Sequence, residues 1–327
     1  MSKENMFYKD KTVLVTGGTG FVGTNFVEEL VRRGARVRVP LHRRPLMVKS
    51  PLIEVVSADL TRLDDCLAVC KDVQYVVHAG GAVSAAGVTV SNPMAVITTN
   101  LIVTVQMLQA AWMAGVERFL LLSSATVYPA ADHPIKEEEI WNGPTHPSYF
   151  AYGWMRRYLE RMSEFVIQKS KMKIALVRPT AVYGPWDNFD PATSHVVPAL
   201  IRKAVEKLDP YEVWGTGDEV RDFIHVSDMV AGSLLCLEKY ATGDAVNLGY
   251  GKSFTVGDVV RIILKAAGHD KAKVRFDASK PTTIPFRMVD IEKARTQFGF
   301  EPKVTLEQGL TDTLNWYKKN RAVAHGG

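Results

Sequence analysis

One stretch, Thr-Gly-Gly-Thr-Gly-Phe-Val-Gly at residues 16–23, constrains the fold of this chain more than any other. It follows an apolar run expected to form a strand and precedes a segment, residues 21–33, that is typical of a helix. In this order the three elements predict a dinucleotide-binding corner. Gly17 permits a tight turn, Gly20 lets the backbone approach a pyrophosphate, and Gly23 lets the helix pack closely on the strand. Because the N–H groups of the first helical turn face the anion, we expect cofactor contacts from Gly17, Gly20, Phe21, Val22 and Gly23.

The end of the second expected strand, residues 37–41, bears on which dinucleotide binds. An acid at this place usually binds the adenosine ribose, but Leu41 occupies it and His42-Arg43-Arg44 follows. Two arginines favour a 2′-phosphate, so the sequence favours NADP, with NAD as the alternative cofactor. Arg43 and Arg44 are therefore expected cofactor contacts. The competing interpretation is a solvated basic loop.

Later strand ends supply four more expected cofactor contacts. The segments 53–56, 73–78 and 173–177 are apolar enough to be strands, and parallel strands present their carboxyl ends at one ligand-binding edge. Asp59 follows the first of these segments and is suited either to accept a hydrogen bond from the adenine amino group or to cap the next helix. The expected contacts at these strand ends are Asp59, Leu60, Ala79 and Pro179.

Alternation of strand and helix patterns through residue 180 predicts an α/β fold. We expect a Rossmann-type, doubly wound parallel sheet that binds NAD(P) over residues 1–180. Beyond residue 180 the alternation breaks, so residues 181–327 are expected to form mainly a smaller, mixed α/β substrate domain, interleaved with the first.

Composition narrows the classes of partner. The net charge of +5 is mild and the basic residues are scattered, so we expect no nucleic-acid partner. The three cysteines form no CxxC pair, which predicts reduced thiols, no metal site and a cytoplasmic protein. Residues 1–10 are too polar for a signal peptide, and no apolar run is expected to reach membrane-spanning length, so we expect no membrane contact.

A second group of residues suits proton transfer to a carbonyl oxygen. Tyr152 and Arg156 lie one helical turn apart on one face of a long helix expected at residues 149–169. A tyrosine shuttles a proton when a nearby cation lowers its pKa, normally about 10, and Ser124 at a strand end can bind the same oxygen. The alternative partner for Arg156 is Glu160, one turn further on.

Longer strings then give the chain a resemblance. They comprise the glycine turn, Tyr152 and the segments 124–128, 179–189, 194–200, 213–217, 221–226 and 276–281. They cover nearly the whole chain, which resembles the extended short-chain dehydrogenase/reductases that act on nucleotide sugars. Within that family the resemblance is strongest to NADPH-dependent enzymes acting on GDP-linked 4-keto sugars. It implies a GDP-linked nucleotide-diphosphate sugar as partner, and a homodimer that pairs the helices expected at 93–114 and 149–169.

Matched position by position, the resemblance assigns roles to single residues. Ser124 and Tyr152 match the active-site serine and tyrosine, Arg156 stands in place of the family's lysine, and His195 matches the acid used in epimerisation. Arginine keeps the positive charge of lysine but is bulkier and holds its proton more firmly. Substrate contacts are implied at Thr126, Asn188, His195, Lys203, Trp214, Arg221 and Lys280.

Thr126 departs from the resembled subgroup, which has a cysteine base there. A threonine hydroxyl is far too weak an acid for that task, so we expect hydride transfer at C4 rather than epimerisation at two centres. The expected function is an NAD(P)-dependent nucleotide-sugar oxidoreductase, a 4-keto reductase on a GDP-linked sugar. The alternatives are a C4 epimerase using bound NAD(P), and a non-catalytic nucleotide-sugar or dinucleotide-binding protein.

Overall fold

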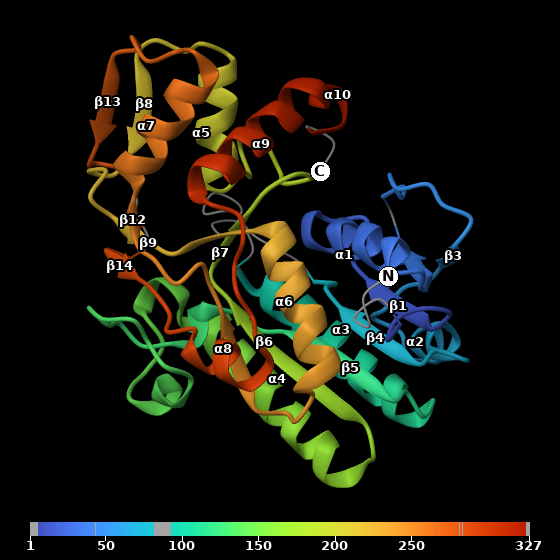
Figure 1. Cartoon of the computed structure of the whole chain (residues 1–327). Helices are drawn as coiled ribbons and strands as arrows, with labels where there is room; N and C mark the ends of the chain where they lie inside the picture. The colour runs from blue at the N-terminus through green and yellow to red at the C-terminus, as the bar shows by residue number, and fades with distance from the viewer. Residues whose placement is uncertain (1–5, 43, 82–92, 281, 283, 325–327) are drawn as a thin grey trace.

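A seven-stranded parallel sheet is the centre of the fold (Figure 1). The computed structural model describes residues 6–42, 44–81, 93–280, 282 and 284–324. The strand order is β11-β6-β5-β4-β1-β2-β3, and every neighbouring pair runs parallel. The strands are β1 (Thr12–Thr16), β2 (Arg36–Leu41), β3 (Ile53–Ser57), β4 (Tyr75–His78), β5 (Arg118–Leu122), β6 (Lys173–Pro179) and β11 (Ala245–Leu248). The doubly wound α/β expectation is confirmed, and the order reverses between β1 and β4, where such sheets bind ligands.

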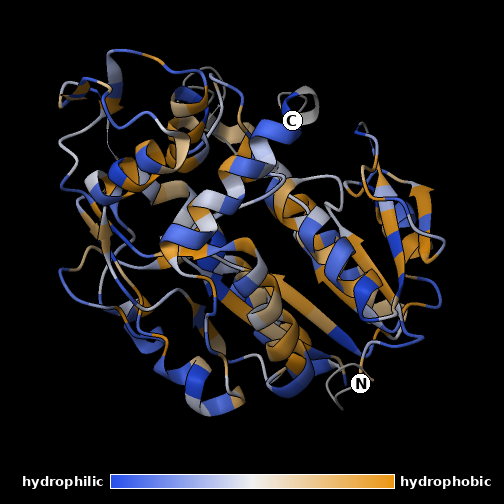
Figure 2. Cartoon of the chain, turned by 45° about the horizontal axis from the view of Figure 1, so that its top comes forward, coloured by the Kyte–Doolittle hydropathy of each residue, from blue (hydrophilic) through white to orange (hydrophobic). Residues whose placement is uncertain are grey.

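Helices cover both faces of this sheet. One core joins the sheet to α1 (Phe21–Arg32), α6 (Val226–Lys239) and α8 (Glu292–Phe298). On the other face lie α2 (Leu63–Cys70), α3 (Pro93–Met113) and α4 (Phe150–Lys169). The central strands are largely hydrophobic, whereas the covering helices carry both hydrophobic and hydrophilic residues (Figure 2). This pattern follows from burying a parallel sheet on both faces and a helix on one.

A smaller body with its own core is built from later parts of the chain. Its helices are α5 (Val196–Val205), α7 (Val256–Ala267), α9 (Leu306–Lys319) and α10 (Arg321–Ala324). Its short strands are β7 (Ala181–Tyr183), β8 (Tyr211–Trp214), β9 (Val220–Arg221), β10 (Phe223–His225), β12 (Phe254–Thr255), β13 (Val274–Asp277) and β14 (Phe286–Arg287). They form three small sheets, β10-β7, β12-β9-β14 and β13-β8. Since β11 and α6 return to the large sheet, the chain crosses between the two bodies several times.

Helix α3 corrects one expectation. Within the described ranges it contains the one stretch, Met94–Met113, that is long and apolar enough by length and composition to cross a membrane. Threonine, asparagine and glutamine interrupt the run of apolar residues in this helix, but none of them adds a charge. In the fold α3 packs against α2 and α4, and a core helix of a layered α/β protein passes the same test.

Candidate functional site

The glycine turn forms a backbone cradle between β1 and α1. Gly17 has a φ of +66°, and a Cβ there would lie 2.6 Å from the carbonyl oxygen of Ala79. A Cβ on Gly23 would collide with the Gly17 carbonyl group. The N–H of Gly20 donates to that carbonyl at 2.9 Å, and no side chain in the described ranges caps α1. The turn therefore leaves space and unpaired N–H groups at the start of α1, as a bound phosphate requires.

A buried polar chain supports this turn. The Oγ1 atom of Thr16 accepts from the N–H of Gly80 at 2.9 Å and lies 2.9 Å from His78 Nδ1, while His78 Nε2 lies 3.0 Å from Thr104 Oγ1 on α3. Burial lowers the pKa of His78 to about 3, and the Arg156 cation acts in the same direction. The ring is therefore neutral at physiological pH and bridges β1 to α3, as a strand-end residue rather than a catalyst.

The basic segment after β2 lies beside the turn. Arg44 is exposed and lines a pocket of about 120 Å³ together with the glycine-turn residues 19–21. Arg43, the other arginine expected to contact the cofactor, lies outside the described residues. Phe21 and Val22 open α1 and are half-buried. The structure thus brings Arg44 to the same pocket as the start of α1.

The remaining cofactor candidates lie at strand ends. Asp59 Oδ1 accepts from the N–H and the hydroxyl of Thr61 at 3.0 and 2.7 Å. These hydrogen bonds lower the pKa of Asp59, which stays ionised. The residue before α2 is Arg62, and no described side chain caps this helix, so the capping alternative for Asp59 is wrong. Leu60 and Pro179 are half-buried at the carboxyl ends of β3 and β6.

Tyr152 and Arg156 contact each other directly on α4. Arg156 Nη2 donates to the Tyr152 hydroxyl oxygen at 2.6 Å, and its guanidinium carbon lies 5.0 Å from the tyrosine ring centroid. Arg156 Nη1 donates to the carbonyl oxygen of Leu122, at the carboxyl end of β5, at 2.9 Å. The arginine is therefore fixed at the ligand-binding edge with its charge on the phenol oxygen, while its buried Nε has no hydrogen-bond partner among the described residues.

Two further hydroxyl groups lie beside this pair. Gly153 lets α4 approach the 3-10 turn η3 (Ala125–Val127), since a Cβ there would lie 2.5 Å from the Thr126 carbonyl oxygen. Ser124 precedes this turn, and its Oγ accepts from the N–H of Thr126 at 3.2 Å. The Thr126 hydroxyl is buried without a hydrogen-bond partner in the described part of the chain. The structure thus brings Ser124, Thr126, Tyr152 and Arg156 to one edge of β5.

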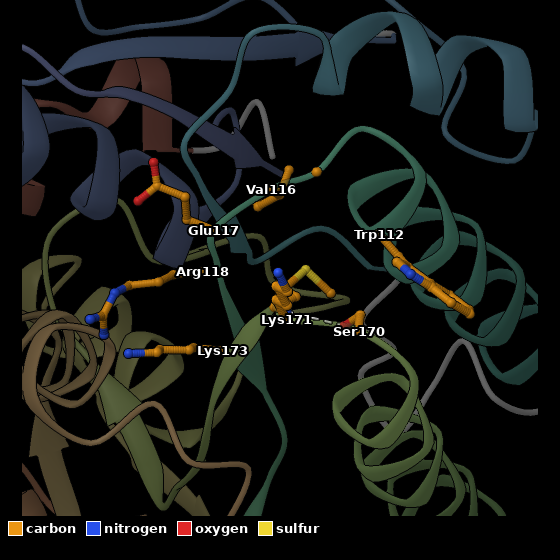
Figure 3. Close-up of a pocket in the computed structure, with 9 residues that line it drawn as sticks. Trp112, Val116, Glu117, Arg118, Ser170, Lys171 and Lys173 are labelled. Atoms are coloured by element: carbon orange, nitrogen blue, oxygen red, sulfur yellow. Dashed lines mark hydrogen bonds between the residues drawn. The ribbon is translucent and has the colours of Figure 1, made fainter.

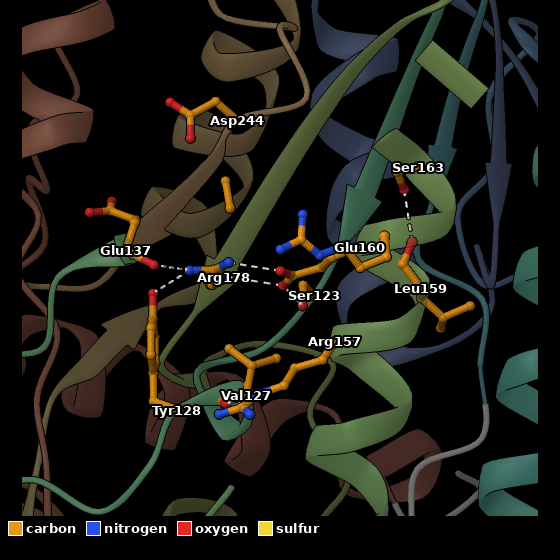
Figure 4. A network of polar contacts seen from close by, with 12 residues as sticks. Ser123, Val127, Tyr128, Glu137, Arg157, Leu159, Glu160, Ser163, Arg178 and Asp244 are labelled. Carbon is orange, nitrogen blue, oxygen red and sulfur yellow. Dashed lines mark hydrogen bonds and ion pairs between the residues drawn. The ribbon is translucent and has the colours of Figure 1, made fainter. Parts of the chain in front are cut away.

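A buried ion pair holds α4 in place under the site (Figure 4). Arg178 on β6 donates to both carboxylate oxygens of Glu160, at 2.7 and 3.0 Å, and both side chains are buried. The hydroxyl of Ser123 donates to the same carboxylate at 2.5 Å, and Arg178 also donates to the Tyr128 hydroxyl at 2.8 Å. Since Glu160 is engaged here, the alternative ion pair between Arg156 and Glu160 is wrong.

The smaller body holds several of the expected substrate contacts. Lys203 Nζ donates to the carbonyl oxygen of Glu212 at 2.8 Å, and burial lowers the pKa of this lysine. Lys280 Nζ lies 6.0 Å from the ring centroid of Trp214, whose side chain is half exposed. His195 precedes α5 and is exposed. These residues lie on the surface of α5, β8 and the segment after β13.

Asn188 occupies a different place. Its side-chain amide donates to the Thr193 hydroxyl at 2.8 Å, and its carbonyl accepts from the N–H of Asp190 at 3.0 Å. It lines the pocket beside the glycine turn together with Arg44. The structure therefore brings Asn188 to the cofactor turn, although the sequence pattern assigned it to the substrate.

Two arginines lie side by side on the small sheet β12-β9-β14. Arg221 on β9 and Arg287 on β14 are register partners on neighbouring parallel strands, so their side chains leave the sheet on the same side. Burial lowers the pKa of both, that of Arg287 to about 10, and each also interacts electrostatically with Tyr149. Arg287 Nη1 donates to the Pro129 carbonyl oxygen at 3.1 Å, whereas its buried Nη2 has no partner among the described residues. Two adjacent, partly desolvated cations favour an anionic ligand.

Sequence reasoning missed Arg287. It lies on a two-residue strand, and no motif in the sequence marks it. The partnership with Arg221 arises from strand pairing between segments 66 positions apart, which a local pattern does not reveal.

A larger pocket, of about 500 Å³, lies away from these residues (Figure 3). Its walls come from the end of α3 and the starts of β5 and β6, with Trp112 on one side and Arg118 and Lys173 on the other. This is the amino edge of the sheet, whereas Tyr152, Arg156 and the glycine turn lie at the carboxyl edge. The residues expected to carry the chemistry therefore lie at the opposite edge of the sheet from this larger pocket.

Comparison with known proteins agrees with this geometry. The profile of the NAD dependent epimerase/dehydratase family matches residues 13–249. A probable GDP-L-fucose synthase of Oryza sativa subsp. japonica is 31% identical over 325 residues, covering 96% of this chain and 94% of the relative. An epimerase structure from Methanothermobacter thermautotrophicus superposes with a TM-score of 0.89 at 27% identity, covering 99% of this chain and 97% of the other.

A further solved structure is UDP-glucose 4-epimerase from Thermotoga maritima with UDP-glucose. It has a TM-score of 0.85 at 26% identity and covers 95% of this chain and 99% of the other. The doubly wound parallel sheet agrees with these structural likenesses. The chain belongs to the NAD dependent epimerase/dehydratase family, whose fold holds a nicotinamide cofactor.

Proposed function

We propose that this protein is an NAD(P)-dependent nucleotide-sugar oxidoreductase that reduces the 4-keto group of a GDP-linked sugar. The contact that carries the proposal is the 2.6 Å hydrogen bond between Arg156 and the Tyr152 hydroxyl at the carboxyl edge of β5. A phenol held by a permanent cation, at the edge where the glycine turn also lies, suits proton transfer to a carbonyl oxygen. The GDP-linked substrate is supported by the synthase relative.

In this proposal each residue of the β5 edge has a separate task. When bound, the nicotinamide exchanges a hydride with a carbon of the sugar. Tyr152 donates a proton to the oxygen of the reduced carbonyl, and Arg156 stabilises the phenolate that results. Ser124 hydrogen-bonds the same oxygen, and Thr126 borders the sugar. His195 contacts the substrate from the start of α5.

We propose NADP as the preferred cofactor and a division of labour along the chain. Residues 1–180 hold the dinucleotide, and residues 181–327 mainly hold the nucleotide sugar. Arg44 beside the glycine turn favours the 2′-phosphate. Free, buried cysteines support a cytoplasmic protein.

The nucleotide sugar would bind along the smaller body. Arg221 and Arg287 suit its diphosphate, because two neighbouring guanidinium groups bind phosphate oxygens bidentately. Trp214 offers a flat face, with Lys280 beside its ring and Lys203 nearby. This assignment gives an anionic partner to the two neighbouring arginine cations.

The first test is whether the cofactor is consumed. With a GDP-linked 4-keto-6-deoxy sugar, we expect one NADPH to be oxidised for each sugar reduced. Loss of the NADPH absorbance measures the oxidation, and mass spectrometry of the sugar measures the reduction. A redox-neutral exchange of two sugars without net NADPH loss would reject the reductase and favour a C4 epimerase. That alternative is supported by the likeness to UDP-glucose 4-epimerase.

The same assay tests the arginine pair. Replacing Arg287 by Met should raise KM for the nucleotide sugar about 10- to 100-fold, since charge-assisted hydrogen bonds contribute roughly 1.5–3 kcal/mol each. The affinity for NADPH should stay within about twofold. Arg275→Met is the matched control, because Arg275 is exposed and paired with Glu212. An unchanged KM in Arg287→Met would contradict the assignment of the diphosphate to these two arginines.

We also propose a homodimer formed through α3 and α4. Large apolar side chains are exposed along these two helices: Ile102, Met113, Trp154, Tyr158 and Phe165. Several large apolar side chains exposed on two adjacent helices favour association. Sedimentation should give twice the chain mass, and Tyr158→Glu should give the monomer mass. A monomeric parent protein would contradict the proposal.

A further inference from the structure

The pocket beside the glycine turn contains an acid that neither the sequence pattern nor the proposed function uses. Asp187, in the loop after β7, is 4% exposed and lines this pocket with Gly20, Phe21 and Arg44. Trp186 and Trp316 complete the wall. The loop is held against α1 by a hydrogen bond from Asn25 to the carbonyl oxygen of Pro185, at 3.0 Å.

One oxygen of this acid has no partner. Asp187 Oδ1 accepts from the N–H of Asn188 at 2.7 Å, whereas the buried Oδ2 has no hydrogen-bond partner in the described part of the chain. A buried carboxylate without a countercharge is strongly disfavoured, so the group takes up a proton instead. Burial accordingly raises the pKa of Asp187 to about 7.

The charged groups around Asp187 do not supply a countercharge that would stabilise its ionised form. Arg44, from the segment after β2, lines the pocket but is exposed, so solvent screens its charge. From α1, the exposed Glu28 accepts a hydrogen bond from Trp186 Nε1 at 3.3 Å, and as an acid it brings no countercharge for a carboxylate. Trp316 from α9 and Ala324 from α10 bring no charge to this wall.

We propose that the protonated carboxyl of Asp187 donates a hydrogen bond to a phosphate group of the bound dinucleotide, so that cofactor binding takes up a proton. The inference rests on the proposed function, because it needs a dinucleotide at the glycine turn. The start of α1 and Asp187 line one pocket, and a neutral acid can donate where a carboxylate would repel a phosphate. The phosphate belongs either to the pyrophosphate or to a 2′-phosphate.

The sign of the pH dependence follows. In the free protein Asp187 is protonated below about pH 7 and ionised above it. Full affinity is therefore present below pH 7 and is lost as the pH rises, because the proton must be restored before the phosphate binds. Between pH 6.5 and 8.5 we expect the dissociation constant to rise more than about 10-fold.

Titration calorimetry at pH 7.5, in buffers of different ionisation enthalpy, measures this uptake. The full-length protein is titrated with NADH, which carries only the pyrophosphate, with NADPH, which adds the 2′-phosphate, and with GDP-mannose. Uptake approaching one proton with NADH assigns the contact to the pyrophosphate. Uptake with NADPH alone assigns it to the 2′-phosphate. Uptake with GDP-mannose alone overturns the proposal.

Two variants separate this role from a structural one. In D187N the side chain is neutral at every pH and still offers a hydrogen-bond donor. The dissociation constant should therefore become independent of pH and stay low at pH 8.5, and the binding enthalpy should no longer depend on the buffer. The matched variant E28Q changes a nearby carboxylate that bonds Trp186 but does not line the pocket, and it should keep the proton uptake of the parent protein.

The failures are distinguishable. If neither dinucleotide binds at any pH, the proposed function fails and this inference fails with it. If a dinucleotide binds the parent protein without proton uptake, or if D187N keeps the parent pH dependence, only the role of Asp187 is overturned. If D187N folds poorly, the calorimetry of the parent protein alone still decides whether dinucleotide binding takes up a proton.

Discussion

Tyr152→Phe should lower kcat for reduction of the nucleotide sugar about 10²- to 10⁴-fold, the usual contribution of a positioned proton donor. The substitution removes the hydroxyl that accepts from Arg156 Nη2 at 2.6 Å and leaves the ring in place. Because the glycine turn is untouched, the dissociation constant of NADPH should change less than about threefold. Turnover is measured by NADPH oxidation and binding by the fluorescence of the bound nicotinamide.

Tyr158→Phe supplies the control for this change. Tyr158 lies on the same helix, on the proposed dimer face, and phenylalanine keeps its ring there, so loss of its hydroxyl should leave turnover within about twofold. Retention of more than about a tenth of the parent kcat in Tyr152→Phe would show that another group protonates the oxygen. A protein with no turnover in its parent form, yet with dinucleotide and nucleotide-sugar binding, would instead be a binding protein.

Glu160→Gln should destabilise the fold by about 3–5 kcal/mol, the range for breaking a buried ion pair from one side. Arg178 is 4% exposed and loses the charge that compensates it, while Ser123 loses a carboxylate acceptor. The measurement is urea denaturation followed by tryptophan fluorescence. Since α4 carries Tyr152, turnover should fall together with stability.

Two companions make this result interpretable. Glu164→Gln, on the same helix, disrupts an exposed pair with Arg161 and should change stability by less than about 1 kcal/mol. The double change of Glu160 to Leu and Arg178 to Met should recover much of the lost stability, because a buried pair is often replaceable by apolar side chains of similar volume. A Glu160→Gln protein as stable as its parent would contradict the role of the pair.

The glycine turn was predictable because its physics is local. Gly17, Gly20 and Gly23 lie within eight residues, and two requirements act inside this segment: the positive φ of Gly17 and the close approach of Gly23 to the Gly17 carbonyl group. The parallel sheet was predictable for a related reason. Strand and helix segments alternate along the chain, and only a few topologies are compatible with that alternation. Helical spacing likewise predicts Tyr152 beside Arg156, four residues on, and the 2.6 Å hydrogen bond confirms the pair.

Long-range partners were not predictable. Spacing alone allowed Arg156 to pair with Glu160, and only the approach of β6 shows that Arg178 takes that carboxylate. Asp59 had the right position to cap α2, yet the turn folds its carboxylate onto Thr61. For Arg156 and Glu160 a distant segment decided between the two partners, whereas for Asp59 a local turn to Thr61, two residues on, did so.

The sequence by itself determined the glycine turn, the parallel α/β sheet and the pairing of Tyr152 with Arg156 on α4, because propensity, glycine requirements and helical spacing act over a few residues. Tertiary structure alone decided which partners the buried charges have. It placed Arg287 beside Arg221, and within the described residues it left one oxygen of Asp187 without a hydrogen-bond partner in the pocket beside the glycine turn. The physical reason is desolvation: the free energy of a charge depends on everything packed around it, and that packing comes from segments far apart in the chain.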